Sequence, residues 1–338
     1  MSAAEEAIWI SEADAVFLMD LGEAIGALER GLLLESQGAA HNMIKTHVAW
    51  EGATLHAIGA VFPSLRLCGT KTWTHTAGGA TPMLLLFDSG TGALKAIIEA
   101  FALGQMRTAA VSGVATRWLA KPDADELAIV GTGKQALAQV AAVLLVRPVR
   151  RVRVFGRDEE RRKEFAAKVR NRFSVEVSEY DSVRAAVAGA SIITLATRAT
   201  EPILFSDMVQ RGVHINSIGA IEPARAEIAQ DVLARATQVV TDSVAQAQKL
   251  SREMIECFDG VPNGWLSVRP LADLVAARVP RKDSDDLSVF KALGVGISDL
   301  SLGVELYRRA MEQEKGYRFA PPLRSAPRLS GNVESAFD

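Results

Sequence analysis

The segment from residue 127 to residue 146 constrains the fold of this chain most strongly. It starts with the apolar run Leu127–Val130, passes through a glycine turn and ends in an apolar stretch with a helical pattern. A buried strand, a tight turn and a helix in this order bring backbone N–H groups and a helix N-terminus to one point, where a pyrophosphate can bind. The turn has the pattern G-x-G-x-x-A, which predicts a dinucleotide site formed by Gly131, Thr132, Gly133, Lys134, Gln135 and Ala136.

Strand and helix patterns alternate along the chain after this turn. Apolar runs rich in β-branched residues at 150–155, 191–197, 214–219 and 238–242 predict further strands. Such alternation is typical of a parallel, doubly wound sheet with right-handed crossovers. This half of the chain is therefore expected to form a Rossmann fold.

The part of the chain before the turn has a different pattern. Residues 1–30 have a mainly helical pattern, with a capping start at Ser11. Strand patterns fill much of 41–98, and a long helix is expected at 101–120. The segment 121–125, Lys-Pro-Asp-Ala-Asp, is the expected linker into the Rossmann part. The fold class predicted is therefore α/β, with a Rossmann sheet and a separate α+β domain.

Composition excludes several classes of protein. The formal net charge of −2 and the isoelectric point near 6.3 give no sign of nucleic-acid or anionic-membrane binding. No apolar run reaches the roughly 18 residues that span a bilayer. The acidic N-terminus lacks a signal-peptide pattern, and Cys68 and Cys257 are too few for a disulfide framework. We therefore expect a cytoplasmic protein that binds neither nucleic acid nor membrane.

No metal is expected. His47, His56 and His75 all fall in the strand-rich part, but their spacing is not that of a metal motif and no cysteine or carboxylate joins them at short range. Strand histidines of this kind are more often hydrogen-bonded or half-exposed. His75, close to Lys71, is retained as a candidate substrate contact.

The end of the second Rossmann strand bears on the choice of coenzyme. Sites that prefer NAD usually carry an acidic residue here, which accepts hydrogen bonds from the ribose hydroxyls. This chain has Gly156 followed by Arg157, whose guanidinium can pair with a 2′-phosphate. Asp158 follows directly, and a shift of one residue would restore the acid; Arg157 can also be a solvated helix-start residue. NADP(H) is favoured, and NAD(H) stays possible.

Candidate substrate residues precede the glycine turn. Arg107 stands among small residues near the start of the long helix, where a guanidinium suits a substrate carboxylate. Lys45 and Lys71 lie in predicted strands and can point into a cleft between the domains. Lysines in strands more often face solvent or lie at a sheet edge, so pattern alone leaves both interpretations open.

Five separated motifs resemble the ornithine cyclodeaminase/mu-crystallin family over roughly residues 8 to 312. Each has the family's form and stands in the family's order. The motifs are Arg107-Thr-Ala-Ala-Val-Ser, Gly131-Thr-Gly-Lys-Gln-Ala, Thr200-Glu-Pro-Ile-Leu, His214-Ile-Asn-Ser-Ile-Gly-Ala and Val289-Phe-Lys-Ala-Leu-Gly-Val-Gly-Ile-Ser-Asp299.

The resemblance implies a homodimer in which each subunit has two domains with different roles. A substrate-binding and dimerisation domain would take 1–120 and be completed by a C-terminal helix at 295–320. The Rossmann domain would take 121–294, and 321–338 would form a tail rich in Pro, Ser and Arg. Family members use NAD(P) with small amino or imino acids.

The resemblance also implies residue roles. The family surrounds the substrate carboxylate with an Arg, a Lys and a second Arg; the Lys maps to Lys71 and the second Arg to Arg107, both expected to be catalytic. The first Arg is replaced by Lys45, which keeps the charge but loses the planar fork. Thr197, Asn216, Ile218 and Gly219, at or near the ends of later strands, are expected at the nicotinamide half of the coenzyme.

One departure from the family decides between activities. Ornithine cyclodeaminases carry an Asp two residues after the glycine of the His-x-Asn-x-x-Gly strand, and this chain has Ile221 there, followed by Glu222. An aliphatic side chain neither accepts a proton nor pairs with an ammonium group. We therefore expect an NAD(P)H-dependent reductase that transfers a hydride to the C=N carbon of a small imino acid or ketimine.

Three alternatives stay open at this point. One is an amino-acid dehydrogenase of the alanine dehydrogenase kind, and another is an ornithine cyclodeaminase-type ammonia-lyase, which would need Glu222 in place of the missing Asp. The third belongs to a different class, a non-catalytic mu-crystallin-like protein that binds NADP. The presence of Lys71 and Arg107 argues against a role in binding alone.

Overall fold

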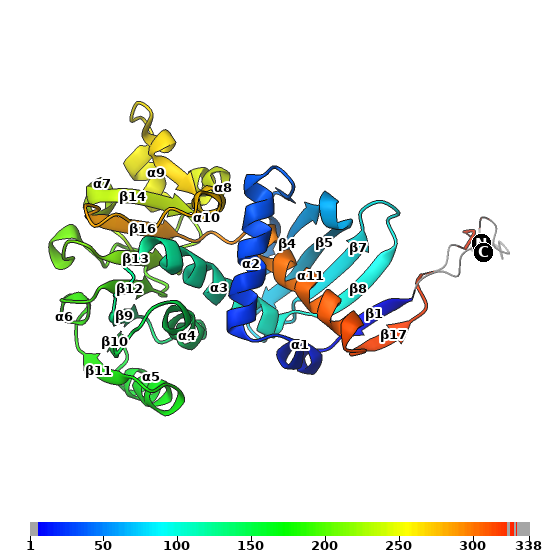
Figure 1. Ribbon diagram of the computed structural model, residues 1–338, viewed down its shortest axis with the longest axis horizontal. Helices are drawn as coiled ribbons and strands as arrows, with labels where there is room; N and C mark the ends of the chain where they lie inside the picture. The colour runs from blue at the N-terminus through cyan, green and yellow to red at the C-terminus, as the bar shows by residue number, and fades with distance from the viewer. Residues whose placement is uncertain (1–5, 323–324, 328, 330–338) are drawn as a thin grey trace, which may run out of the picture.

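The computed structural model of the protein describes residues 6–322, 325–327 and 329. Two β-sheets lie side by side in it, one of nine strands and one of eight. Helices α2 (Leu21–Ser36) and α3 (Phe101–Leu119) lie between the sheets and contact each other, as Figure 1 shows. The expected tail at 321–338 lies in large part outside the described residues.

The nine-stranded sheet is formed mainly by the N-terminal part of the chain. Its strand order is β17-β1-β8-β7-β5-β4-β2, with β3 paired to β4 and β6 to β5. All pairs are antiparallel except β1 with β8. The strands are β1 (Ala7–Ile10), β2 (His41–Asn42), β3 (Thr46–Trp50), β4 (Ala53–Phe62), β5 (Leu67–Thr76), β6 (Gly79–Ala80), β7 (Met83–Asp88), β8 (Leu94–Glu99) and β17 (Tyr317–Phe319).

The described residues up to residue 30 are mainly helical, as expected, but a strand precedes the helices. Residues Ala7–Ile10 form strand β1, because their side chains fill a place beside β8 on the buried sheet. The predicted helix start at Ser11 is confirmed: its hydroxyl accepts from the backbone N–H of Asp14, and the Asp14 carboxylate accepts from the backbone N–H of Ser11. Helix α1 (Glu12–Leu18) follows.

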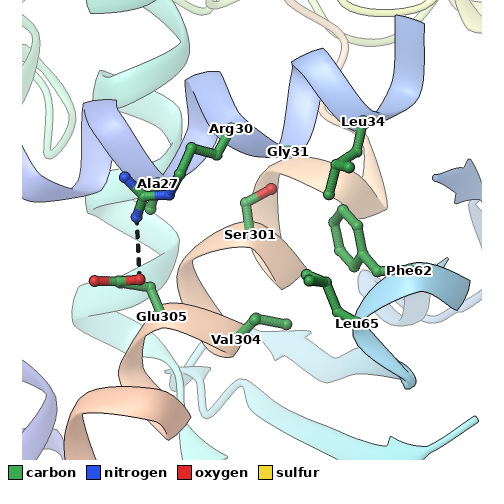
Figure 2. A pocket seen from close by; sticks show the side chains of 9 residues that line it. All are labelled: Ala27, Arg30, Gly31, Leu34, Phe62, Leu65, Ser301, Val304 and Glu305. Atoms are coloured by element: carbon green, nitrogen blue, oxygen red, sulfur yellow. Dashed lines mark hydrogen bonds and ion pairs between the residues drawn. The ribbon is translucent and has the colours of Figure 1, made fainter. Parts of the chain in front are cut away.

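One face of the nine-stranded sheet is covered by helices. Helix α11 (Gly296–Glu312) crosses β4, β5 and β7, and α2 packs on α11 (Figure 1). At the crossing of α2 and α11, Ser301 faces Gly31, where a side chain would overlap the Ser301 hydroxyl. Figure 2 shows this crossing and the ion pair of 3.0 Å between Arg30 Nη2 and Glu305 Oε2 beside it.

The expected helix at 295–320 is wrong at its C-terminal end. Helix α11 ends at Glu312, and Glu314 and Gly316 both have positive φ angles, of 52° and 87°. These left-handed residues turn the chain back, so that Tyr317–Phe319 pairs with β1 as an antiparallel edge strand. The last strand of the sheet is therefore supplied by a segment expected to be helical.

The eight-stranded sheet is parallel at every strand pair. Its order is β11-β10-β9-β12-β13-β16-β14-β15, which confirms the predicted doubly wound sheet with β9 at its switch point. The strands are β9 (Glu126–Val130), β10 (Arg151–Phe155), β11 (Glu176–Tyr180), β12 (Ile192–Leu195), β13 (His214–Ser217), β14 (Ala236–Thr241), β15 (Val268–Pro270) and β16 (Leu287–Lys291).

Helices pack on both faces of this parallel sheet. The strands of its centre are fully buried: the side chains of Leu127, Ile129, Ile193 and Ile215 have no exposed surface. The connecting helices are α4 (Ala136–Val146), α5 (Glu159–Arg172), α6 (Val183–Val187), α7 (Gln230–Arg235), α8 (Val244–Leu250), α9 (Arg252–Phe258) and α10 (Leu271–Ala277).

Helix α3 connects the two sheets in space. Its last turn is bound to the parallel sheet through Arg281, whose Nη1 donates to the carbonyl oxygens of Leu119 and Val213. Its first turn, about 22 Å away at 1.5 Å per residue, lies beside the nine-stranded sheet. The domain boundaries expected at 120 and 294 stay a prediction, and the two sheets divide the chain close to them.

The contact between α11 and β4 leads to a prediction about stability. A Cβ on Gly296 would overlap the backbone of Gly59, so a substitution must separate the helix from the sheet. Gly296→Ala is expected to lower the free energy of unfolding by about 2 kcal/mol or more. Gly26→Ala on α2 is the matched control, since its Cβ would lie 3.6 Å from the mobile end of Arg30. The control should be neutral or slightly stabilising in urea denaturation, and equal losses in both variants would contradict this account.

Candidate functional site

The glycine turn after β9 has the geometry that a pyrophosphate site needs. Gly131 has a φ angle of 107°, and a side chain there would overlap the carbonyl oxygen of Ala196. Gly133 has open space where a Cβ would stand, which leaves its backbone free for close approach. Helix α4 starts directly after the turn. The side chain of its N-cap residue, Gln135, makes no hydrogen bond to the first backbone N–H groups of the helix. Ala136 is fully buried against the strand. These residues fit a dinucleotide.

The end of β10 is followed by Gly156, Arg157 and Asp158. Gly156 packs on Thr132, whose methyl carbon would lie 2.8 Å from a Cβ at this position, so a larger residue would displace the turn. Asp158 is the N-cap of α5 and accepts from the backbone N–H of Arg161 at 3.0 Å. Asp158 therefore serves as a helix cap through one of its two oxygens. Arg157 is exposed, and Arg162 donates to the carbonyl oxygen of Gly156 at 2.9 Å.

The ends of β12 and β13 converge on one carboxylate. Glu227 has no exposed surface, and its Oε1 accepts from the backbone N–H of Thr197 at 2.7 Å. Its Oε2 accepts from the backbone N–H of Gly219 at 2.9 Å. Ile218, between these groups, is 6% exposed and packs into the core between the two sheets. Thr197, Ile218 and Gly219 thus lie close together, and their contact with the coenzyme stays a prediction.

Asn216 lies elsewhere than expected. Its side chain is fully buried, where it donates to Thr116 Oγ1 at 3.0 Å and contacts His214 Nε2, also at 3.0 Å. Burial lowers the pKa of His214 to about 3, so the ring is neutral. Asn216 stands inside the sheet, opposite α3, with both ends of its amide engaged. It joins α3 to the parallel sheet and is closed off from a ligand.

A buried ion-pair cluster lies where α3, α11 and β5 meet. The Lys71 ammonium forms a hydrogen-bonded ion pair with Asp299 Oδ1, and both residues are at most 4% exposed. Arg107 Nε lies 3.4 Å from the same Asp299 oxygen, an ion-pair distance without hydrogen-bond geometry. Asp299 Oδ2 has no hydrogen-bond partner among the described residues. The cluster therefore contains two cations and one carboxylate.

The ends of two parallel strands lie against this cluster. Asp242, after β14, accepts from the backbone N–H of Gly294 at 2.7 Å, after β16. Gly294 has a φ angle of 82°, and a Cβ there would lie 2.8 Å from Arg107 Nη1. Because parallel strands end at one edge, this is the edge that also carries the glycine turn. The cluster thus lies at the carboxyl edge of the parallel sheet.

Lys45 completes the charge distribution. Burial lowers its pKa, and the neighbouring Arg107 lowers it further, while Asp242 and Asp299 act in the opposite sense. Burial also lowers the pKa of Lys71 to about 8, against the effect of Asp299. Lys45, Lys71 and Arg107 thus lie near the buried carboxylates of Asp242 and Asp299, and this group of cationic side chains suits a carboxylate of a ligand.

Stacked rings extend from Lys71 along the same face of the sheet. The Lys71 ammonium lies 4.9 Å from the centre of the Trp73 ring. Trp73 stacks on His56 at 4.7 Å, and His56 on His47 at 5.5 Å. Burial lowers the pKa of His56, which favours its neutral form. His75 lies exposed at the end of β5, outside this stack.

The loop after β13 carries no acid in the family's Asp position. Ile221 is 36% exposed, and the next residue, Glu222, forms an ion pair of 2.7 Å with Arg225. Glu222 is thus committed to a neighbour on its own loop. The assignment of Ile221 to the position of the family's proton acceptor stays a prediction.

Other features of the described residues lie apart from this site. A hollow of about 60 Å³ lies between α2 and α11 (Figure 2), and one of about 470 Å³ lies between α2, α3 and α10. Neither is lined by Lys71 or Arg107. In the described part of the chain, no group of three or more His, Cys, Asp and Glu residues could hold a metal ion. No helix there is long and apolar enough to cross a bilayer.

Three residues of the site were not predicted from the sequence. Asp299 belongs to a segment that the family resemblance directed toward the active site, but its partners were not foreseen. Arg162 lies in the first turn of α5, five residues after Arg157, and this spacing gave only a weak signal in the sequence. Glu227 stands among small residues in a loop, where an acidic residue normally faces solvent.

The comparisons with known proteins agree with this geometry. A Δ1-pyrroline-2-carboxylate reductase of Bacillus cereus is 31% identical over 268 residues, which are 78% of this chain and 80% of that protein. The ketimine reductase mu-crystallin of Rattus norvegicus is 35% identical over 217 residues, 64% of this chain and 66% of that protein.

Among solved structures, the Thermococcus litoralis Δ1-pyrroline-2-carboxylate reductase in complex with NADH and L-proline superposes with a TM-score of 0.85 at 26% identity. The match covers 92% of this chain and 99% of that one. The family model of ornithine cyclodeaminase/mu-crystallin proteins matches residues 10–314. The chain therefore belongs to the ornithine cyclodeaminase/mu-crystallin family.

Proposed function

We propose that this protein is an NAD(P)H-dependent reductase that converts a small imino acid or ketimine into the corresponding amino acid. The observation that carries this proposal is the cluster of Lys71, Arg107 and Asp299 at the carboxyl edge of the parallel sheet. It combines a surplus of positive charge for a substrate carboxylate with the edge at which a dinucleotide binds. Relatives that reduce Δ1-pyrroline-2-carboxylate and ketimines support it.

Arg107 and Lys45 are proposed to bind the substrate carboxylate. Arg107 Nη1 lies beside Gly294, and its Nε lies 3.4 Å from Asp299 Oδ1. Binding by two cations orients the carbon next to the carboxylate, which lowers the entropic part of the barrier. Trp73 and His56 provide a flat, largely apolar wall on one side of Lys71. A small ring or flat side chain suits this wall.

Lys71 is proposed to hold a proton next to the reacting nitrogen. A bound reduced nicotinamide supplies the hydride and is oxidised, while the imine carbon is reduced and the C=N electron pair takes a proton at nitrogen. The Lys71 ammonium stabilises the carboxylate of the protonated imine or gives its proton to the nitrogen as the bond is reduced. Asp299 keeps this ammonium charged despite its burial.

NADP(H) is the proposed coenzyme. Gly156 leaves no acid for the ribose, Asp158 is engaged as a helix cap, and Arg157 is exposed beside the glycine turn with Arg162 behind it. A guanidinium in this place favours a 2′-phosphate, whereas an acid would repel it. The glycine turn, Lys134 included, would bind the pyrophosphate.

A homodimer in a reducing, cytoplasmic setting is part of the proposal. The face of the nine-stranded sheet opposite Lys71 carries Val48, Trp50 and Leu55, which are 57%, 46% and 43% exposed. A second copy that covers this face would remove an apolar patch from water. Residues 1–120 and the C-terminal segment would then serve substrate binding and dimerisation. Cys68 and Cys257, both unpaired, fit a reducing compartment.

The substrate class can be tested by following NADPH oxidation with three substrates. The account predicts fast turnover with Δ1-pyrroline-2-carboxylate, slower turnover with pyruvate plus methylamine, and little with pyruvate plus ammonia. Turnover only with pyruvate and ammonia would show an amino-acid dehydrogenase instead. Tight NADPH binding without turnover of any imine would support the binding-protein alternative.

The role of Arg107 gives a second test of the site. Arg107→Ala is expected to lower kcat/KM for the imine by about a hundredfold or more, because an anchor of the carboxylate is lost. NADPH affinity should stay within about twofold. Arg117→Ala is the matched control, since Arg117 stands on the same helix but pairs with Glu29 at the surface. A large loss of NADPH affinity in Arg107→Ala would refute the assigned role.

The pKa of Lys71 predicts the pH dependence of the reaction. If the ammonium form is required, kcat/KM falls tenfold per pH unit above about pH 8. In Asp299→Asn, the fall in kcat/KM should begin at a lower pH, because the carboxylate that favours the charged form of Lys71 is lost. Lys71→Arg should keep residual activity without the fall in kcat/KM at high pH, since a guanidinium does not titrate in this pH range. A fall in kcat/KM that begins at a higher pH in Asp299→Asn would contradict the assignment of this pH dependence to Lys71.

Coenzyme preference is tested at Arg157. Arg157→Ala is expected to raise the Kd for NADPH about tenfold or more and to change the Kd for NADH by less than about twofold. Lys168→Ala, which removes one exposed charge further along α5, is the control. Equal losses for both coenzymes would rule out a contact with the 2′-phosphate.

A further inference from the structure

Glu227 is the most heavily hydrogen-bonded buried carboxylate at the carboxyl edge of the parallel sheet. It lies in the irregular segment between β13 and α7 and has no exposed surface. Its two oxygens accept from five donors, which belong to Thr197, Ser217, Gly219 and Ala220. A carboxylate accepts with both oxygens, so it satisfies all these donors without offering a proton.

The five donors belong to two different loops. Oε1 accepts from the backbone N–H of Thr197 at 2.7 Å and from its hydroxyl at 2.8 Å, on the loop after β12. Oε2 accepts from the Ser217 hydroxyl at 3.1 Å, Gly219 N–H at 2.9 Å and Ala220 N–H at 3.3 Å, at the end of β13 and on the loop that follows it. One side chain thus sets the distance between the ends of two neighbouring strands.

The fit between these loops leaves no room for adjustment at Gly219. A Cβ there would lie 2.5 Å from Glu227 Oε1 and would also overlap the carbonyl oxygen of Thr197. The Thr197 hydroxyl donates to Glu227 and accepts from the backbone N–H of Ala199 at 3.2 Å. The Thr197 side chain is therefore engaged within the protein.

A second buried carboxylate holds Glu227 itself in place. Glu253 Oε1 accepts from the backbone N–H of Ile228 at 2.9 Å and from that of Glu227. Glu253 Oε2 pairs with Lys291 Nζ at 2.5 Å, and Lys291 also donates to the Ser217 hydroxyl at 3.0 Å. These residues are at most 2% exposed. A network with its own ion pair thus supports a carboxylate that touches no cation directly.

The strand order assigns these loops to one half of the coenzyme. Neighbours across the sheet run β10-β9-β12-β13. With the pyrophosphate at the turn after β9, the adenosine half lies over β10, where Gly156 and Arg157 stand. The other half must then lie over the ends of β12 and β13, where Glu227 joins the loops.

We propose that Glu227 is the positioning residue for the nicotinamide half of the coenzyme. This inference rests on the proposed function. Glu227 acts through the backbone of Thr197, Gly219 and Ala220 and contacts no reacting atom itself. It fixes the floor on which the nicotinamide ring rests and so the direction in which the hydride leaves. The adenosine half does not depend on it.

The test compares two ligands that differ only by the nicotinamide riboside half. Wild-type protein, Glu227→Gln and Ser217→Ala are titrated with NADPH and with 2′-phospho-ADP-ribose, by fluorescence or calorimetry. If the wild-type protein takes the unphosphorylated coenzyme, NADH and ADP-ribose are used. Gln keeps one acceptor oxygen and turns an N–H₂ group toward donors. Ser217→Ala removes the hydroxyl that donates to Glu227 and accepts from Lys291, with little change of shape.

Glu227→Gln is expected to weaken NADPH binding about tenfold and to leave 2′-phospho-ADP-ribose within about twofold. The kcat for the imine should fall by about a hundredfold, as expected for a displaced reactant, with a larger deuterium isotope effect from labelled coenzyme. Ser217→Ala should show the same difference between the two ligands, with a smaller loss of NADPH affinity, and this variant is less prone to unfold. Asp231→Asn on α7, whose carboxylate accepts only from Ser206 among the described residues, is the control and should change neither affinity.

The outcomes separate this inference from the proposed function. The positioning role would be overturned if Glu227→Gln and Ser217→Ala lowered the affinity for both ligands equally, or left both affinities unchanged. Either result would leave the reductase proposal intact. A wild-type protein that binds neither dinucleotide nor its fragment would overturn both. A loss confined to the nicotinamide-bearing ligand supports the inference.

Discussion

The ion pair between Lys71 and Asp299, with Arg107 beside it, is the interaction on which the arrangement of the site depends. It joins a strand of the nine-stranded sheet, the helix that returns from the parallel sheet and the helix between the sheets. Removing one partner of such a buried pair leaves an uncompensated charge and destabilises a protein by about 3–5 kcal/mol. The same burial that makes the pair necessary lowers the pKa of Lys71 to about 8, into the range where a lysine can hold or release a proton.

Helix α3 transmits the position of the parallel sheet to this cluster. Its C-terminal half is bound to that sheet through Asn216 and Thr116 and through Arg281 and Leu119, while Arg107 stands near its N-terminal end. Because a helix is stiff, Arg107 keeps a defined distance from the strand ends. Glu227 is proposed to perform the complementary task on the coenzyme side, since it joins the loops after β12 and β13. In this proposal, separate buried polar groups at one edge of the sheet fix the contacts of substrate and coenzyme.

The sequence predicted what depends on local pattern and missed what depends on distant partners. The strand, turn and helix around Gly131 are encoded by neighbours in the chain, so fold class and turn were predictable. The strand Ala7–Ile10 was missed because its partner β8 is almost ninety residues away, and the edge strand after Gly316 depends on β1 in the same way. Asn216 has a polar side chain at a strand end, but its neighbour on α3 turns it inward. Asp299 and Glu227 gain their roles only from tertiary contacts, which no spacing in the sequence reveals.

The ion-pair cluster of Lys71, Arg107 and Asp299 is proposed to act together with the glycine turn, so that a hydride passes directly from the coenzyme to the imine carbon. The most direct measurement follows deuterium from NADPH labelled on one face of nicotinamide C4 into the product formed from Δ1-pyrroline-2-carboxylate. The account predicts one deuterium at the α-carbon of a single proline enantiomer, and label retained in the coenzyme when the opposite face is labelled. Product without deuterium from either labelled coenzyme, or label in both enantiomers, would contradict it.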